Sequence, residues 1–246
     1  STRPDVVGDD LAVQLRVLQD KLPPFDMALA RSAVEQELGE PVSAIFSDFS
    51  EPVAAASIAQ VHFAVTADGR EVAVKVLRPG IEEAFRRDID LLRWVAGLVE
   101  TARPDLQRLK PLVAIETLAE TVEMEMDLRF EAAAASELAE NFKGDTDFIV
   151  PQVDWGRTGK RVLVTERLHG TPLDDRDALI DAGLDPGDIL TKAANATFRQ
   201  VFRDGFFHAD MRPGNIFVSQ AGQYRAVDFG IMGTLGEKDK QYLAEN

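Results

Sequence analysis

One loop and one tripeptide constrain this chain more than any other feature of its sequence. The segment HADMRPGN, residues 208–215, places Asp210 and Asn215 five residues apart in one short loop. Asp228 follows Asn215 after thirteen residues, at the start of the tripeptide Asp-Phe-Gly. Carboxylate and amide oxygens are ligands that Mg²⁺ accepts, and this ion bridges phosphates wherever phosphoryl groups are transferred. The spacing therefore predicts a metal and phosphate site, with Asn215 and Asp228 as the metal ligands.

The two motifs meet only if the chain between them folds back on itself. Residues 216–219 and 224–227 predict the two strands of a hairpin that returns Asp228 to the loop. Asp210 is then the candidate base or substrate-orienting carboxylate. Each motif alone would be an ordinary turn or a common tripeptide. Together they match the catalytic loop and metal motif of protein kinases, although Ala209 replaces the arginine of that pattern.

The composition excludes several other classes of function. The 42 acidic and 27 basic residues among 246 give a net charge of -15, so we expect no nucleic-acid partner. The absence of cysteine excludes disulfides and thiolate chemistry and suits a reducing, cytoplasmic environment. No uninterrupted apolar run approaches the roughly 20 residues that span a bilayer.

Two helices are predicted before the first strand. Asp9 or Asp10 would cap the first, whose leucines recur at helical spacing until Pro23. Asp26 would cap the second, which ends at Gly39. Its buried face would be formed by Ala30, Val34 and Leu38.

The rest of the chain alternates strands and helices. A β-hairpin is predicted from residues 60–65 and 71–77, with its turn at Asp68-Gly69. Its second strand, Val72-Ala73-Val74-Lys75, carries a lysine where kinases contact the α- and β-phosphates, although an ordinary surface lysine would read the same. The remaining expectations are helices over 82–100, from Pro111 to about Phe142 and over 186–203, and a strand over 161–165.

Alanines occupy the places where a kinase has the glycines of its phosphate-binding loop. Ala54, Ala56 and Ala59 precede Val61 at those positions. Glycine tolerates positive φ and lets backbone amides approach phosphate, whereas a Cβ atom restricts both. We therefore expect this loop to hold a nucleotide differently from the loop of an ordinary kinase.

Five motifs in order resemble the UbiB family, which is also called the ABC1 or ADCK family of atypical kinases. They are AAASIAQVH, VAVK, EMDLRFEA, HADMRPGN and DFG, and the resemblance covers nearly the whole chain. It implies an α+β, two-lobed protein-kinase-like fold with additional N-terminal and inserted helices and, here, a truncated C-lobe. The predicted parts are an N-terminal helical extension at 1–50, an N-lobe at 51–165 and a partial C-lobe at 166–246.

The resemblance also assigns further residues to the site. Lys75 matches the nucleotide-site lysine and Glu131 its ion-pair partner, while Glu82 and Glu83 lie nearer the usual separation. Glu125 and Asp127 match the family's regulatory E-x-D motif, and Glu125 would otherwise be a surface ion-pair partner of Arg129, four residues on. The K-x-G-Q motif that works with E-x-D is absent, so we expect the chain to begin just after it.

Contacts with the nucleotide complete the predicted site. The alanine-rich segment is expected to bind ATP through Ala54, Ala55, Ala56 and Ser57. The strand at 161–165 runs toward a hinge, where Glu166 and Leu168 are the candidates for contacts with adenine, although a plain connector is an alternative.

The function implied by the resemblance is a Mg²⁺-dependent ATPase or kinase in ubiquinone or other prenyl-lipid metabolism. Its substrate would be a small molecule or lipid such as a quinone precursor. The full-length protein would contact a membrane peripherally through regions outside this sequence. Two alternatives stay open: a nucleotide-sensing, pseudokinase-like regulatory module and a true protein kinase.

Overall fold

The computed structural model describes residues 23–245. The first predicted helix, with Leu11, Leu15, Leu18 and Leu22, lies outside them. The chain divides into two compact units, Ser1–Met126 and Asp127–Asn246.

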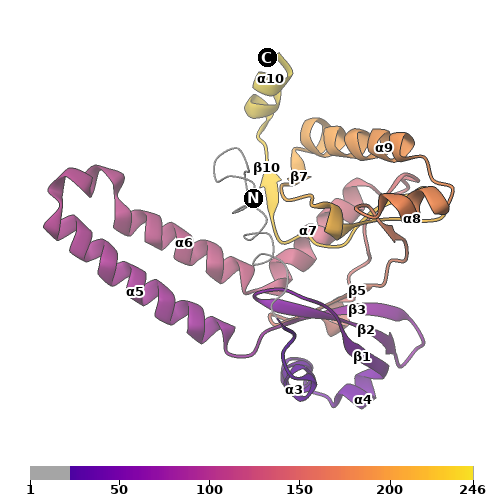
Figure 1. Ribbon diagram of the computed structural model, residues 1–246, viewed down its shortest axis with the longest axis horizontal. Coiled ribbons are helices and arrows are strands. Elements are labelled where there is room, and N and C mark those ends of the chain that lie inside the picture. The colour runs from indigo at the N-terminus through magenta and orange to yellow at the C-terminus, as the bar shows by residue number, and fades with distance from the viewer. Residues whose placement is uncertain (1–22, 246) are drawn as a thin grey trace. The chain divides into compact units, whose positions relative to one another are not determined.

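The first unit contains an antiparallel meander of three strands: β1 (Phe46–Ala55), β2 (Ala59–Thr66) and β3 (Glu71–Leu77) (Figure 1). The pairing of β2 with β3 runs without a shift from Ala59 opposite Leu77 to Val65 opposite Glu71. Gly69 has a φ of 85° in the turn, a conformation that glycine adopts without strain. The predicted hairpin is therefore confirmed. Strand β1 was not predicted.

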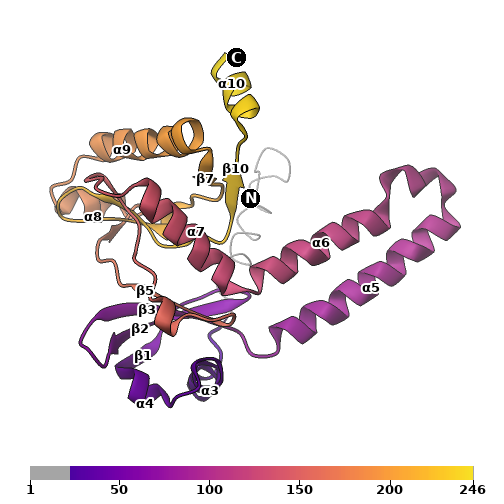
Figure 2. The same cartoon turned by 180° about the vertical axis from the view of Figure 1, so that it is seen from behind.

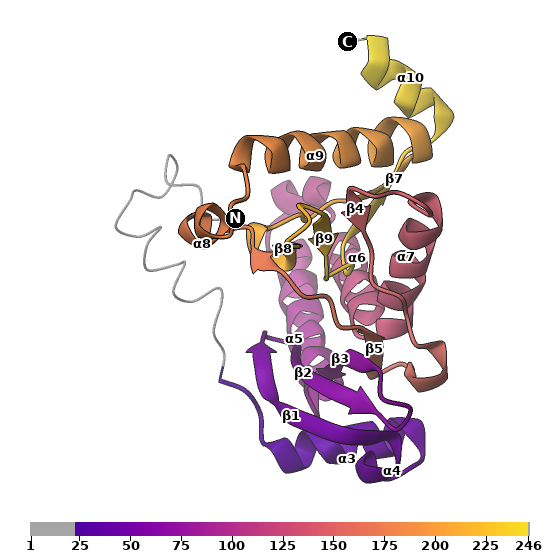
Figure 3. The same ribbon diagram turned by 90° about the vertical axis from the view of Figure 1, so that its right-hand side faces the viewer.

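Helices α3 (Met27–Leu38) and α4 (Val42–Ile45) precede the sheet (Figure 3). The predicted cap of α3 is confirmed, because the Asp26 carboxylate accepts a hydrogen bond of 2.7 Å from the backbone N–H of Ala28. Gly39 ends the helix in the left-handed conformation. Ala30 and Val34 of the predicted apolar face are fully buried, whereas Leu38 is only half-buried.

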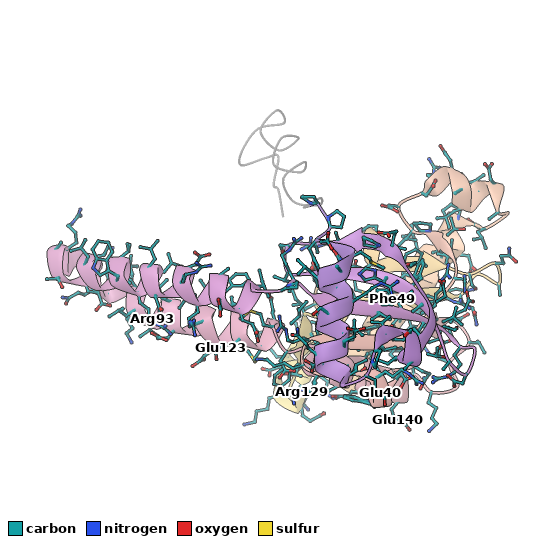
Figure 4. All side chains as sticks on the ribbon, turned by 90° about the horizontal axis from the view of Figure 1, so that it is seen from below. Glu40, Phe49, Arg93, Glu123, Arg129 and Glu140 are labelled. Atoms are coloured by element: carbon teal, nitrogen blue, oxygen red, sulfur yellow. The ribbon has the colours of Figure 1, made fainter. Side chains whose placement is uncertain are left out.

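One face of the sheet buries polar side chains as well as valines. His62 is fully buried, and its ring stacks on that of Phe49, with centroids 4.6 Å apart (Phe49 is labelled in Figure 4). Its Nδ1 lies 2.9 Å from the carbonyl of Ser50 and its Nε2 lies 2.9 Å from the amide nitrogen of Gln60. Burial is the largest influence on the pKa of His62 and lowers it.

Beyond β3 the first unit contains a helical hairpin formed by α5 (Ile81–Ala102), the 3₁₀ helix η1 (Pro104–Leu109) and α6 (Pro111–Glu125). Arg93 of α5, labelled in Figure 4, donates two hydrogen bonds of 2.8 Å to Glu116 of α6. None of the helices described between residues 23 and 245 is both long and apolar enough to cross a bilayer.

The prediction of one helix from Pro111 to Phe142 is wrong. Helix α6 ends at Glu125, and α7 (Leu128–Asn141) begins after a break at Met126 and Asp127. The carboxylate of Asp127 caps α7 by accepting a hydrogen bond of 3.1 Å from the backbone N–H of Arg129. A side chain that satisfies the first amides of a helix makes a start there stable without glycine or proline.

The second unit has two small sheets, with strand orders β4-β9-β8-β6 and β10-β7. In Figure 3 the pair β8–β9 lies below α9. Its elements after α7 are β4 (Phe148–Ile149), η2 (Trp155–Arg157), β5 (Val162–Glu166), β6 (Thr171–Pro172), α8 (Arg176–Asp181), α9 (Pro186–Phe198), η3 (Arg199–Asp204), β7 (Phe206–His208), η4 (Pro213–Asn215), β8 (Ile216–Val218), β9 (Tyr224–Ala226), β10 (Met232–Thr234) and α10 (Glu237–Glu245).

The core of the second unit joins α7 and α9, both visible in Figure 2, to the strands. Phe148 is buried edge-on against Phe142, with ring centroids 4.7 Å apart, and lies beside Tyr224 of β9. Burial raises the pKa of the Tyr224 hydroxyl to about 12. The predicted hairpin of residues 216–219 and 224–227 is confirmed by the antiparallel pairing of β8 with β9.

The buried imidazole of His62 predicts a pH-dependent stability of the sheet. Because its pKa is lower in the folded chain, the unfolded chain binds more protons as the pH falls below about 6.5. The free energy of unfolding should therefore fall with pH in that range. His62→Phe should weaken this dependence, as measured by urea unfolding from pH 8 to 5.

The matched control is Phe49→Leu, which removes the stacked ring and keeps the imidazole. It should lower stability at every pH and keep the pH dependence. Equal pH dependence in the parent and in His62→Phe would contradict the assignment.

Candidate metal and phosphate site

Backbone pairing holds the HADMRPGN loop against the Asp-Phe-Gly segment. Strand β7 pairs with β10, with His208 opposite Met232. The backbone N–H of Ala209 donates to the carbonyl of Ile231 at 3.0 Å, and that of Val227 donates to the carbonyl of Asn215 at 3.1 Å. The two motifs are therefore joined by main-chain hydrogen bonds on both sides of the predicted metal ligands.

The side chain of His208 adds a second connection between the motifs. Its Nδ1 accepts a hydrogen bond of 3.1 Å from the backbone N–H of Asp210. An imidazole nitrogen that accepts carries no proton, so the proton lies on Nε2, which donates to the backbone carbonyl of Asp228. The buried neutral ring thus connects the main chain of Asp210 to that of Asp228 and braces the loop.

The predicted metal ligands meet at this point. The amide nitrogen of Asn215 lies 3.5 Å from Oδ2 of Asp228, although thirteen residues separate them. Oδ1 of Asp228 accepts a hydrogen bond of 3.1 Å from the backbone N–H of Gly230, which fixes the direction of the carboxylate. A cation here would bind the amide oxygen of Asn215 and a carboxylate oxygen of Asp228.

Asp210 lies in the same loop and forms an ion pair with Arg212. The Nε of Arg212 lies 3.1 Å from Oδ1 and 2.9 Å from Oδ2 of Asp210. The Asp210 side chain is about one-third exposed, at 35%, so a substrate hydroxyl or water can reach its carboxylate. This placement suits the predicted role as a base or orienting group.

Gln200 supports the HADMRPGN loop through a hydrogen bond, and no motif in the sequence predicted this role. The predicted helix over 186–203 becomes a π-helix, η3, over its last turn, and this brings the fully buried side chain of Gln200 to the loop. Its Oε1 accepts a hydrogen bond of 2.9 Å from the backbone N–H of His208. The sequence did contain a signal, because Gln200 takes the next place in the apolar stripe of Ile189, Ala193 and Ala196.

Glu131 is buried in the second unit. Its Oε1 lies 3.5 Å from the backbone nitrogen of Phe229, the central residue of the Asp-Phe-Gly motif. The rival acids Glu82 and Glu83 lie in the first turn of α5, in the same unit as Lys75. The pairing of Lys75 with Glu131 stays a prediction.

The two acids of the E-x-D motif do not share a helix. Glu125 is the exposed last residue of α6, and Asp127 lies before the first turn of α7. The four-residue spacing of Asp127 and Glu131 in the sequence predicts that they share one helical face, but this prediction is wrong, because Asp127 is an extended cap residue. The guanidinium of Arg129 donates hydrogen bonds of 2.8 and 2.6 Å to Asp127, and these lower the pKa of this carboxyl.

The alanine-rich segment is largely strand. Ala54 and Ala55 lie in β1 opposite Val61 and Gln60, which corrects the expectation of a loop at these two positions. The connection is a short turn closed by a hydrogen bond of 2.8 Å from the N–H of Ala56 to the carbonyl of Ala59. Residues 56–59 are called the alanine turn below. None of them has a positive φ, so the backbone accommodates their Cβ atoms.

Lys75 lies on β3, half-buried and opposite Val61 of β2. It alternates with the buried residues Val74 and Val76, so it points to the sheet face opposite theirs. In the second unit, Glu166 ends β5 and is exposed, and its N–H donates to the carbonyl of Gln152 at 2.8 Å. Leu168 follows in the connection after β5 and is half-buried. Their contacts with adenine stay predictions.

Two features define the class, which is that of a kinase-like protein. One is the β2–β3 hairpin that carries Lys75, and the other is the HADMRPGN loop with its hydrogen bonds to the Asp-Phe-Gly segment. Residues 17–246 match the ABC1 atypical kinase-like domain. The chain belongs to this family, which confirms the resemblance of the motifs and the α+β kinase-like fold class.

Known proteins of similar sequence and structure agree with this assignment. A protein named "Probable protein kinase UbiB" from Marinobacter nauticus is 47% identical over 251 residues, and one of the same name from Shewanella frigidimarina is 45% identical over 252 residues. Each match covers the whole chain and 46% of the relative, so the chain spans about half the length of these relatives. The structure of the Rv3197–erythromycin complex from Mycobacterium tuberculosis matches with a TM-score of 0.73 and 32% identity over 94% of this chain and 57% of that one.

A substitution at Gly205 tests how tightly β7, which leads into the HADMRPGN loop, is held against β10. It has a φ of 66°, and a Cβ added there would lie 2.6 Å from the carbonyl oxygen of Leu235, next to β10. Gly205→Ala should therefore strain the backbone and push β10 away from β7. The matched control, Gly183→Ala, has a φ of 74° with nothing within 4 Å and should cost about 1–2 kcal/mol.

Urea unfolding should show that Gly205→Ala costs at least about 1 kcal/mol more than Gly183→Ala, because the added methyl group overpacks the site. Equal losses in the two variants would show that the β7–β10 contact tolerates displacement.

Proposed function

We propose that this chain binds ATP with Mg²⁺ at the loop motifs and supports phosphoryl transfer or ATP hydrolysis. The approach of Asn215 to Asp228 at 3.5 Å carries the proposal. Their oxygens suit Mg²⁺. Between residues 23 and 245, no group of three or more His, Asp or Glu side chains could hold a metal alone, so phosphate oxygens and water would complete the coordination.

Each residue then has a defined task. Bound magnesium-ATP supplies the phosphoryl group and the charge that stabilises its transfer. Asp210 orients the attacking hydroxyl, from water or from a substrate alcohol, and accepts its proton. His208 keeps the backbone of Asp210 fixed relative to that of Asp228. Lys75, paired with Glu131, and the alanine segment from Ala54 to Ser57 contact the phosphates.

The substrate proposal comes from the family rather than from the geometry. We infer a small-molecule or lipid acceptor, such as a quinone precursor, in prenyl-lipid metabolism. The full-length protein would act in the cytoplasm and contact a membrane through regions outside this sequence, and Glu125 and Asp127 would have a regulatory role. The names of the relatives, "Probable protein kinase UbiB", support kinase-like chemistry.

The alanine turn favours a second candidate, a nucleotide-sensing module without productive transfer. Alanine Cβ atoms limit how closely backbone amides approach a phosphate. Tight nucleotide binding without turnover in the full-length protein would favour this candidate over the ATPase or kinase.

Replacing one carboxylate oxygen of Asp228 or of Asp210 tests the leading proposal. Asp228→Asn removes a charged oxygen ligand and should abolish Mg²⁺-dependent ATP turnover, a loss of at least about 100-fold in kcat. Asp210→Asn should also abolish turnover while nucleotide binding persists. Phosphate release and nucleotide affinity should be measured on the full-length protein.

The matched control is Asp177→Asn at an exposed position in the first turn of α8, which should leave turnover at the parent level. Unchanged turnover in Asp228→Asn, or no ATP binding by the parent, would overturn the proposal.

Glycine in place of an alanine between residues 54 and 59 should change the selectivity between ADP and ATP. Replacing Ala54, Ala56 or Ala59 removes a Cβ and widens the allowed backbone conformations. The ratio of ADP to ATP affinity should shift in at least one variant, as measured with fluorescent nucleotides. Ala67→Gly, in the other turn of the same sheet, should leave that ratio unchanged, and unchanged ratios in all three variants would remove the segment as a control element.

A further inference from the structure

The main chain of residues 23–26 lies beside the alanine turn. These residues lead into α3, and two side chains from the sheet hold them there. One is Gln60, which directly follows the turn at the start of β2, and the other is Arg78, which follows the end of β3. All of these groups belong to the first unit.

The side-chain amide of Gln60 pairs with both backbone groups of Phe25, its N–H and its carbonyl, as the backbone of a neighbouring strand would. Its Oε1 accepts a hydrogen bond of 2.9 Å from the N–H of Phe25, and its Nε2 lies 3.4 Å from the carbonyl of the same residue. Gln60 is 1% exposed, so water does not compete for these groups. Its amide nitrogen also meets Nε2 of His62 at 2.9 Å.

His62 fixes which way the Gln60 amide points. Because Nδ1 of His62 faces the carbonyl of Ser50 at 2.9 Å, this nitrogen carries the ring proton. Nε2 must then accept, so the group of Gln60 that faces it is the NH₂. The carbonyl oxygen of Gln60 is thereby directed to the N–H of Phe25. A chain of hydrogen bonds thus runs from β1 through β2 to residue 25.

Arg78 holds the alanine turn and residues 23–26 at once. Its backbone N–H donates to the carbonyl of Ile58 in the turn at 2.7 Å. Its Nη2 donates to the carbonyl of Pro23 at 3.1 Å and reaches the carbonyl of Ala56 at 3.5 Å. The guanidinium also lies 5.3 Å from the centre of the Phe25 ring. One residue therefore contacts both ends of the connection.

The burial of one guanidinium nitrogen of Arg78 lowers the stability of the fold. Its Nε is buried and has no hydrogen-bond partner among the described residues. A buried N–H without a partner destabilises a fold, and such a group in a native structure calls for another explanation. Holding the turn in one geometry is an explanation that fits its other contacts.

We propose that Arg78 is a positioning residue that sets the geometry of the alanine turn for nucleotide phosphates. With Gln60 it makes this geometry depend on residues 23–26, so any partner or chain movement that displaces them changes nucleotide affinity. Arg78 acts through the turn's carbonyls and does not touch phosphate itself. The inference rests on the proposed nucleotide-binding function.

Arg78→Met tests the inference, because methionine keeps an unbranched side chain and removes every guanidinium hydrogen bond. Two measurements on the full-length protein are needed: amide hydrogen exchange without nucleotide, and affinities for magnesium-ADP and magnesium-ATP with fluorescent nucleotides. Exchange should accelerate at Phe25 and Ala56. The ratio of the two affinities should change by about threefold to tenfold, which is the effect expected from the net contribution of a typical hydrogen bond.

Two further variants separate positioning from general destabilisation. Arg78→Lys keeps a cation that reaches one carbonyl at a time and should restore part of the parent ratio. Arg87→Met removes an exposed arginine of α5 whose Nε donates to the carbonyl of Glu83 in the same helix at 3.3 Å, and should change neither measurement. Gln60→Met breaks the second connection and should accelerate exchange at Phe25.

The outcomes distinguish this inference from the proposed function. Faster exchange in Arg78→Met with an unchanged affinity ratio would overturn the positioning role and leave nucleotide binding intact. Unchanged exchange at both amides would overturn the connection itself. If the parent binds neither nucleotide, the proposed function is wrong, and the role of Arg78 toward nucleotides is overturned with it, while exchange still reports whether the turn is held.

Discussion

The two hydrogen bonds of the His208 ring are the interaction on which the candidate site depends. A neutral imidazole has one accepting and one donating nitrogen, and here each is used on a different motif. The connecting strands β8 and β9 have only three residues each, so their ladder alone would allow large movements at Asp228. The ring removes that freedom, because it fixes the backbone of Asp228 relative to that of Asp210.

Spacing predicted this part of the molecule well, for a physical reason. A hairpin of two short strands returns the chain to its starting point whatever the details of its turn, so the approach of Asn215 to Asp228 follows from their separation. The hairpin of β2 and β3 was equally predictable, because Asp68-Gly69 supplies the positive φ of its turn. The chemical roles of these residues stay predictions that the geometry supports.

Other elements left weak signals in the sequence. Strand β1 pairs with β2 through three register shifts and contains Pro52, so it lacks the alternation that marks a strand. The break between α6 and α7 depends on a capping carboxylate rather than on glycine or proline, and an aspartate within a helical pattern is easily taken as an exposed position. Contacts such as that of Gln60 with Phe25 depend on the folded chain and have no local pattern.

The π-helix at Arg199–Asp204 has a consequence for how the chain tolerates changes in length. A π-turn contains about one residue more than an α-turn, and each residue of an α-helix turns the chain by about 100°. A deletion of one residue in this turn would restore regular α-helix and remove the bulge that places the side chain of Gln200 against the loop. The support of the loop therefore depends on the number of residues in this turn as much as on their identity. An alignment gap here would separate relatives that keep the buried glutamine against the loop from relatives that need another way to hold the loop.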